Sequence, residues 1–333
     1  MKRIIALLLA VGMVLSLTAC GTDSDSTAQT SAPASEASAE VSAQEPTAPA
    51  EESSTPEPSA PAEASAEETP ASSVDSAPAA VSTEGAEETV ILDNEICTVT
   101  LKSIDPDNMW GYTWNVLLEN KTEQNLMFSL DDVSVNGVMC DPFWATAVSA
   151  GMSANSEISW DSEDFALSGI TEATVVEFQL TVYDDDNLNM DYLVDQVFTV
   201  YPLGEDAATT VEYTPKDSDV VLFDNDSCSM IVTGYEPDNE WGYTVNVYLL
   251  NKTDTRLMFT VDGASVNDFM CDPFWATTVS AGKAAYSQLT WSSEDFETNG
   301  ITEVEKITLP VTVYDDTLLL SDDIVSETFT LEP

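Results

Sequence analysis

Apolar and polar residues alternate with period two along most of the chain after residue 88. The clearest case is a stretch in which Val176, Phe178, Leu180 and Val182 alternate with polar residues. Such alternation predicts half-buried β-strands, because successive side chains in a strand point to opposite faces. Clusters of Asp, Asn, Pro and Gly separate the alternating segments, as is typical of turns. The pattern therefore predicts an all-β fold.

The alternating region contains one domain twice. The segment Met139–Thr146 reads MCDPFWAT and recurs unchanged at Met270–Thr277. An offset of about 131 residues aligns the two copies without a gap, and about half of the aligned positions are identical. Each copy is long enough to bury its own core. We expect one domain at residues 89–202 (repeat 1), a linker at 203–218, and a second domain at 219–333 (repeat 2).

Within repeat 1 the pattern predicts several short strands. They are expected at residues 97–104, 112–119, 126–136, 154–160, 176–182 and 194–201. Short strands joined by turns, without amphipathic helices, favour a two-sheet sandwich. A helical turn is expected at 161–165, with Ser162 as its cap. In repeat 2, Pro310 occupies an outward position of a strand, which predicts a sheet edge or a bulge there.

The N-terminus has the pattern of a secretory signal. Met1-Lys2-Arg3 is a positive start, and the apolar run that follows is short for a membrane span. The sequence Leu-Thr-Ala-Cys that ends at Cys20 resembles the lipobox of bacterial lipoproteins. That resemblance implies cleavage of a signal peptide at 1–19 and a lipid on Cys20. We expect a lipid-anchored protein on the extracytoplasmic face of a bacterial cell membrane, of the Gram-positive type.

Residues 20–88 are predicted to be a disordered acidic tether. The segment consists mainly of Ala, Ser, Thr, Pro and Glu, and it contains no Lys or Arg. Few large apolar side chains are present to offset the entropy of ordering, and like charges repel one another. The expected role is to hold the repeats away from the membrane.

Several short motifs in both repeats match a known kind of surface domain. They are Asn-Lys-Thr at 120–122, Val-Ser-Val-Asn at 133–136, the Ala-Gly turn at 150–151 and Thr-Val-Tyr-Asp at 181–184. With these motifs each repeat resembles the telokin-like, immunoglobulin-like domains of bacterial surface lipoproteins, most of which have no characterised function. The resemblance implies two tandem immunoglobulin-like β-sandwich domains and says little about activity.

The formal net charge of −51 limits the class of partner. Nucleic acids and anionic surfaces are repelled by such a chain, so we expect no nucleic-acid binding. Partners are expected to be neutral, cationic or bridged by a metal ion. The charge also keeps a surface protein soluble, which explains it without any ligand.

Each repeat contains one pair of cysteines. Cys97 and Cys140 belong to repeat 1, and Cys228 and Cys271 to repeat 2. Disulfides form outside the cytoplasm, and pairing within each repeat is favoured among the three connectivities that four cysteines allow. The alternative is two buried thiols per repeat. Cys97 and Cys228 share the parity of apolar strand residues, so both are expected to point inward.

The absence of histidine excludes catalysis by Ser-His-Asp or Cys-His groups and metal sites built on His. A glycosidase needs only two carboxylates, and candidates exist at Asp161, Glu163, Asp164, Asp184 and Asp185. Paired carboxylates arise by chance in so acidic a chain, and a domain of this size lacks the usual deep cleft. We therefore expect no enzymatic activity and no organic cofactor.

Aromatic side chains are the main candidates for ligand contact. The candidates are Trp110, Tyr112 and Trp144 in repeat 1 and their counterparts Trp241, Tyr243 and Trp275. Flat rings next to Asp or Asn can stack on sugar rings and bind their hydroxyl groups. The alternative is that aromatic residues such as Phe143, Trp144 and Trp160 pack the core around the cysteines. Trp110 follows a turn and precedes Gly, a position where rings are often exposed.

A calcium site is the second candidate. Oxygen ligands gather on one turn of each repeat, at Asp105, Asp107, Asn108, Glu236, Asp238 and Asn239. The turns lack the Gly and the final Glu of an EF-hand, and acidic turns of this composition are also stable when simply solvated.

Two functions are consistent with these features. The first is a non-catalytic binding or adhesion module that presents one patch twice to a glycan, a cell-wall polymer or a protein. The second is a structural spacer, stiffened by calcium, without a specific ligand. Exposure of Trp110 and Trp241 favours the first, whereas burial of both rings favours the second.

Overall fold

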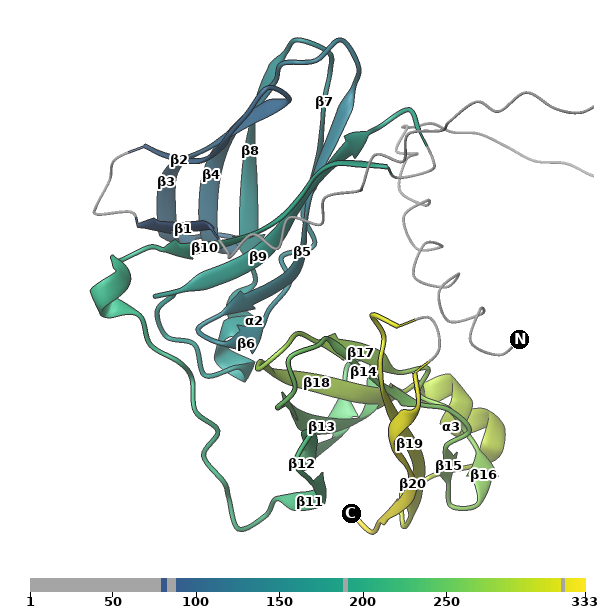
Figure 1. Cartoon of the computed structure of the whole chain (residues 1–333). Helices are drawn as coiled ribbons and strands as arrows, with labels where there is room; N and C mark the ends of the chain where they lie inside the picture. Colours follow the sequence, from purple (N-terminus) through teal and green to yellow (C-terminus); the bar gives the residue numbers. More distant parts are fainter. Residues whose placement is uncertain (1–78, 83–87, 188–190, 319–320) are drawn as a thin grey trace, which may run out of the picture. The chain divides into compact units, whose positions relative to one another are not determined.

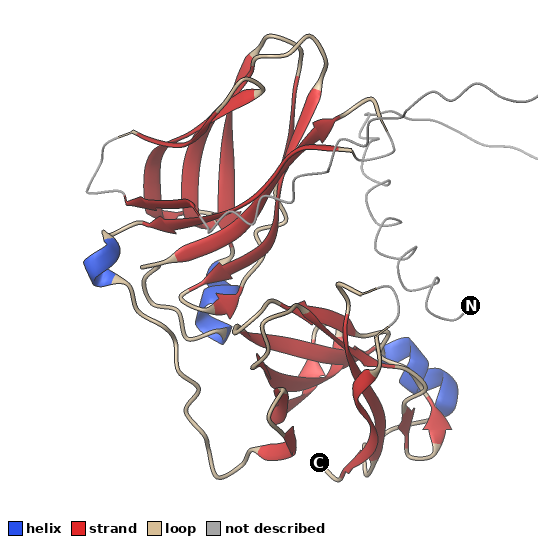
Figure 2. Ribbon diagram, in the orientation of Figure 1, coloured by secondary structure: helices blue, strands red, loops and turns tan. Residues whose placement is uncertain are grey.

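The computed structural model describes residues 79–82, 88–187, 191–318 and 321–333 (Figure 1). The predicted signal peptide, Cys20 and the tether up to residue 78 lie outside these residues. Strands dominate the described chain, and its helices are short (Figure 2). No helix in this part of the chain is long and apolar enough to cross a bilayer. The predicted all-β class is confirmed.

One sheet of repeat 1 is entirely antiparallel. Its strands follow the order β2 (Thr89–Asp93), β3 (Cys97–Asn108), β4 (Gly111–Asn120) and β8 (Ser153–Trp160). Neighbouring strands are joined by hairpins or lie at the sheet's ends, so the sheet has one face for the core and one for solvent.

The second sheet of repeat 1 is built around β9 (Val176–Asp184). Its other strands are β1 (Ala79–Ser82) and β10 (Tyr192–Tyr201) on one side, and β5 (Leu126–Val135), β6 (Val138–Met139) and β7 (Ala145–Val148) on the other. Ala79–Ser82 was expected to belong to the disordered tether. That prediction is wrong for these four residues, because β1 pairs in parallel with β10.

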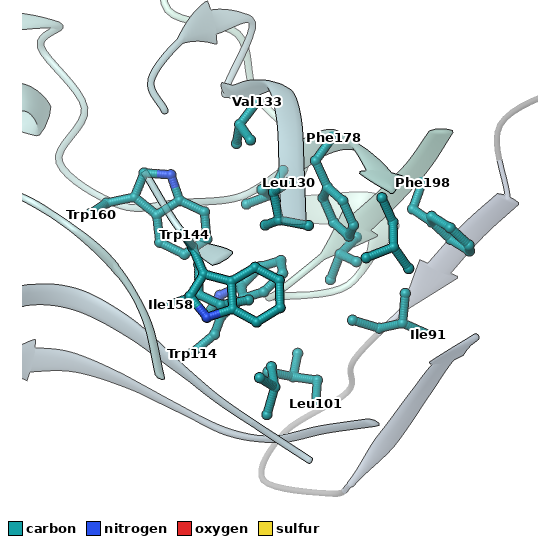
Figure 3. Close-up of a cluster of buried hydrophobic side chains, with 14 of the residues drawn as sticks. Ile91, Leu101, Trp114, Leu130, Val133, Trp144, Ile158, Trp160, Phe178 and Phe198 are labelled. Atoms are coloured by element: carbon teal, nitrogen blue, oxygen red, sulfur yellow. The ribbon is translucent and has the colours of Figure 1, made fainter. Parts of the chain in front are cut away.

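The two sheets of repeat 1 enclose a common core (Figure 3). Trp114 of β4 packs edge-on against Trp160 of β8, with ring centroids 5.2 Å apart. The same ring meets Phe178 of β9 on the facing sheet at 6.1 Å. Aromatic pairs in these geometries stabilise a core beyond the area that they bury. The predicted inward residues of β9 are all buried, at Val176, Phe178, Leu180 and Val182.

Repeat 2 has the same architecture around its own core. One sheet contains β11 (Val220–Asp224), β12 (Cys228–Asn239), β13 (Gly242–Asn251) and β18 (Ala284–Trp291). The other contains β14 (Leu257–Val261), β15 (Ser265–Val266), β16 (Phe269–Met270), β17 (Ala276–Val279), β19 (Ile307–Asp315) and β20 (Asp323–Leu331).

Pro310 does not lie on an edge strand, because β19 pairs with β20 on one side and with β14 and β15 on the other. The second part of the prediction describes the site better. Val311 pairs with Val261 of β14 and Thr308 with Ser265 of β15. Pro310 falls in the interruption between these ladders, where its missing N–H costs no sheet hydrogen bond.

A short helix follows the last strand of the first sheet in each repeat: α2 (Ser162–Leu167) and α3 (Ser293–Asn299). The cap of α2 is Asp161, whose Oδ1 accepts a hydrogen bond from the Glu163 N–H at 2.7 Å. The expected cap, Ser162, is therefore wrong by one residue. Ser292 occupies the matching position in repeat 2 and accepts from the Asp295 N–H at 3.2 Å.

The predicted disulfides are absent. The described cysteines are all free and buried: Cys97, Cys140, Cys228 and Cys271. Cys97 pairs with Asn120 at one end of β4. The carbonyl of Cys140 instead accepts a hydrogen bond from Trp160 Nε1 at 2.9 Å, and Trp160 pairs with Tyr112 at the other end of β4.

The two ends of β4 lie about 26 Å apart at the rise of an extended strand. A disulfide requires Cα atoms within about 7 Å, so the pairing within each repeat is geometrically excluded. Repeat 2 has the same arrangement, since Cys228 pairs with Asn251 and the Cys271 carbonyl accepts from Trp291 Nε1. The expectation that Cys97 and Cys228 point inward is confirmed, because neither is exposed.

Candidate functional site

The hairpin between β3 and β4 carries an exposed tryptophan at its tip. Asn108 pairs with Gly111, so the loop consists of Met109 and Trp110. The side chain of Asn108 caps this loop, because its Oδ1 accepts a hydrogen bond from the Trp110 N–H at 3.0 Å. Trp110 is 66% exposed and Met109 is 84% exposed. The hairpin thus holds a large ring in solvent on a short, hydrogen-bonded loop.

Repeat 2 has the same hairpin tip between β12 and β13. Asn239 pairs with Gly242, and Asn239 Oδ1 accepts from the Trp241 N–H at 3.0 Å. Trp241 is 74% exposed. The first loop residue differs, since Glu240 replaces Met109. The tryptophan, its capping asparagine and the following glycine are therefore the shared features, and we refer to them as the hairpin tip.

The predicted calcium ligands lie at the base of the hairpin tips, and several bind neighbouring protein groups. Asp105 accepts hydrogen bonds from the Asp107 N–H and from Asn108 Nδ2, both at 3.3 Å. Asp107 itself is exposed, as is Asp238 in repeat 2. Within the described ranges, no three Asp, Glu or Cys side chains gather closely enough to hold a metal ion.

In repeat 2 the base of the hairpin tip is more tightly bonded. Both carboxylate oxygens of Glu236 accept hydrogen bonds, from Asn246 Nδ2 at 2.6 Å and from Asn239 Nδ2 at 2.8 Å. These two bonds lower the pKa of Glu236. The carboxylate therefore orders the asparagine that caps Trp241, which is a structural role that needs no metal.

The tyrosines that follow the hairpin tips lie in or near the core. Tyr112 is half-buried and packs against Trp160 and Phe165, with ring centroids 5.7 and 5.6 Å away. Its hydroxyl accepts a hydrogen bond from Trp114 Nε1 at 3.1 Å. Burial raises the pKa of Tyr112 to about 12. Tyr243 is buried as well. These rings have no free face for stacking on a ligand, which corrects the expectation for both.

Trp144 and Trp275 are also buried, each only 8% exposed (Figure 3 for Trp144). Their indole N–H groups donate to the hydroxyl oxygens of Ser156 and Ser287, both at 2.9 Å. The expectation that these two tryptophans contact a ligand is therefore replaced by the alternative, core packing. Of the six candidate rings, Trp110 and Trp241 alone are exposed.

One exposed aromatic pair was missed. Phe143 and Phe274 are 96% and 90% exposed, although the sequence favoured core packing for Phe143. Both adopt a positive φ, 48° and 49°, which is rare for a bulky residue. Asp141 Oδ1 accepts from the Phe143 N–H at 2.8 Å, and Asp272 does the same for Phe274 at 3.1 Å. The sequence signal was Asp-Pro, which favours a turn that reverses the next side chain.

No protein-family model matches the chain, and no curated protein matches it. Among solved structures it is similar to the Salmonella enterica SafA pilin in complex with the SafB chaperone, at 10% identity and a TM-score of 0.19, over 66% of this chain and 89% of that one. A second is the CsuC-CsuE chaperone and tip adhesion subunit complex of Acinetobacter baumannii, at 11% identity and a TM-score of 0.18, over 64% and 89%.

A third similar structure is the exo-chitosanase CsxA of Amycolatopsis orientalis. It has 10% identity and a TM-score of 0.19, and the match covers 69% of this chain and 26% of that one. TM-scores this low carry no inference about ligand, partner or activity. The function must therefore be argued from the residues of the site itself.

Proposed function

We propose that the protein is a lipid-anchored, extracytoplasmic binding module without catalytic activity, which presents the same aromatic hairpin tip twice. The observation that carries this proposal is the exposure of Trp110 and Trp241, at 66% and 74%. A spacer without a ligand gains nothing from an exposed indole, whereas exposed aromatic residues are enriched at recognition surfaces. The two copies differ at about half of their positions, yet both retain this tryptophan.

The order of the hairpin tip also supports recognition. Each tryptophan follows an asparagine whose side chain fixes the loop, at 3.0 Å from the tryptophan N–H. A ring on a fixed loop loses less conformational entropy on binding than a ring on a free loop. The polar groups beside the ring, such as Asn108 and Asp105 in repeat 1, suit a ligand with hydroxyl groups.

The ligand class follows from shape and charge. A flat, isolated indole suits stacking on the apolar face of a sugar ring, and the net charge of −51 disfavours anionic polymers. We therefore propose a neutral or cationic glycan or cell-wall polymer as the ligand. Two hairpin tips on one chain would raise the apparent affinity for a repeating polymer, provided that both engage together.

The location is part of the same proposal and rests on the N-terminal sequence. A lipid on Cys20 would anchor the chain, and the acidic tether would hold the repeats beyond the membrane. The absence of histidine from the whole sequence supports a non-catalytic role.

The experiment uses the mature chain from residue 20 with Cys20→Ser, so that the protein is soluble. Its binding to a glycan array and to purified cell-wall polymers is measured with millimolar calcium and with a chelator. The test variant is Trp110→Ala with Trp241→Ala. The matched control is Phe143→Ala with Phe274→Ala, which removes two equally exposed rings from a different loop.

Selective binding that the tryptophan double variant loses and the phenylalanine control retains would support the proposal. We expect the same result with chelator, because the carboxylate of Glu236 is already occupied by two asparagines. Absence of binding to every glycan and polymer would contradict the proposal and favour the structural spacer.

A further inference from the structure

A short strand from outside the expected domain completes one sheet of repeat 1. Ala79 pairs with Phe198 and Val81 with Val200, so that β1 runs parallel to β10. Ala79 and Val81 are half-buried and pack against the core, whereas Ala80 between them is exposed. The strand therefore covers the outer edge of β10 and adds small aliphatic side chains to the core.

Repeat 2 has the acceptor strand without this cover. The residues that match Phe198, Thr199 and Val200 are Phe329, Thr330 and Leu331, the same residue types. Among the described strands, β20 pairs with β19 alone. The difference is visible in burial: Thr199 is 7% exposed and Phe198 is 1% exposed, whereas Thr330 is exposed and Phe329 is half-buried.

The segment that the repeat offset would bring to β20 is held elsewhere. One period after β1 lie residues 210–213. The Val211 N–H donates to the Asn136 carbonyl of repeat 1 at 2.9 Å. The hydroxyl of Tyr213 donates to Asp219 at 2.6 Å. These contacts keep the segment away from β20, so the outer edge of that strand stays available.

We propose that the outer edge of β20 binds an extended segment of a partner protein by strand addition. Backbone N–H and C=O groups along an open edge supply the hydrogen bonds for such a strand, and pockets for alternate side chains give selectivity. Repeat 1 defines the chemistry of the occupant: at least four extended residues, parallel to β20, with small aliphatic side chains at alternate positions. The site is distinct from the hairpin tips and does not depend on their function.

A second copy of this chain is a poorer occupant than another protein. Its Ala79–Ser82 segment already pairs with its own β10, and moving it to β20 of a neighbour would expose the edge that it left. The gain and the loss involve similar contacts. A partner whose extended segment is not already paired has no such cost.

The test appends a strand to the full mature chain. Residues 77–84 are repeated after Pro333 through a Gly/Ser linker of about 15 residues, which spans roughly 20 Å on average. The matched control carries Val81→Asp in the appended copy only, so the original fold is untouched. Native-state hydrogen exchange is then compared at the backbone amides of Thr328, Phe329, Thr330 and Leu331.

The proposal requires exchange at one or more of these amides to slow by about tenfold in the fusion relative to the Val81→Asp control. Equal exchange in the two proteins would overturn it. Slower exchange at the amides of Phe198 to Val200, with none at β20, would also overturn it, because the appended strand would then be competing for the edge of β10.

Discussion

The carbonyl oxygen of Trp160 lies only 2.0 Å from the position that a Cβ atom on Gly111 would occupy. The matching pair in repeat 2, Trp291 and Gly242, has the same separation of 2.0 Å. Gly111 also has a φ of 97°, a conformation that side chains disfavour. The exposed tryptophan of each hairpin tip is therefore followed by a residue that has to be glycine.

We expect Gly111→Ala to lower the free energy of unfolding by about 3 kcal/mol, since backbone strain and a clash with a main-chain carbonyl combine. Urea denaturation monitored by tryptophan fluorescence measures this change. The control is Gly151→Ala, which has a φ of 65° but no atom within 4 Å of the added Cβ, and should cost about 1 kcal/mol. Equal losses in both variants would mean that φ alone, and not the close approach, requires glycine.

Neighbouring aromatic residues in the shared MCDPFWAT segment should respond differently to truncation. Trp144→Ala removes a buried ring and is expected to cost about 3 to 5 kcal/mol of unfolding free energy. Phe143→Gly removes an exposed ring and relieves a positive φ, so the change should stay within about 1 kcal/mol. Thermal unfolding of both variants measures the contrast. A loss for Phe143→Gly as large as that for Trp144→Ala would show that Phe143 packs in solution.

The buried thiols make stability sensitive to alkaline pH. Burial raises the pKa of Cys97 from 9.0 to about 11, and that of Cys140 to about 12. Above pH 9 the unfolded chain releases these protons while the folded chain retains them, so the unfolded state binds fewer protons. Stability therefore falls as pH rises from 9 toward 11, and the contribution is fully present below pH 9.

Chemical denaturation across this pH range tests the expectation. The double variant Cys97→Ala with Cys140→Ala should have a shallower decline than the parent protein, although its stability at neutral pH is lower. Reducing agent should leave the parent's melting temperature unchanged, because its cysteines are already free. A large drop on reduction would instead indicate a disulfide.

Much of the fold follows from local pattern. The period-two alternation predicts β9 and its inward residues, because a strand with one buried face has to alternate. The duplication predicts that both repeats share one architecture. The alternation does not predict β1, since Ala-Ala-Val-Ser has low strand propensity within an acidic, Pro-rich segment and is selected only by its contact with β10.

The site was harder to predict for a related reason. Adjacent aromatic residues such as Phe143 and Trp144 have to point in different directions, and the sequence does not say which one faces the core. The Asp141 side chain decides this by fixing a turn at Phe143. The cysteine pairs were misjudged because spacing along the chain does not reveal at which end of β4 each one lies.

A buried asparagine in each repeat should be the most sensitive polar position in the fold. Asn120 is 3% exposed, and its Nδ2 donates to the carbonyls of Gln124 and Val148 at 2.8 and 2.9 Å. Its Oδ1 accepts from the N–H and the hydroxyl of Thr122, at 2.9 and 2.8 Å. Asn251 makes the matching bonds in repeat 2.

We expect Asn120→Ala to lower the free energy of unfolding by about 3 kcal/mol or more, because buried carbonyls and an N–H lose their partners. Asn120→Asp keeps the acceptor and the shape but loses both donors, so it separates the two halves of the network. If the donors to Gln124 and Val148 dominate, Asn120→Asp will be as damaging as Asn120→Ala at pH 7, and its loss will shrink at low pH, where a protonated carboxyl donates again. Denaturation of both variants at neutral and acidic pH measures this, and a nearly wild-type Asn120→Asp at pH 7 would contradict the assigned role of the donors.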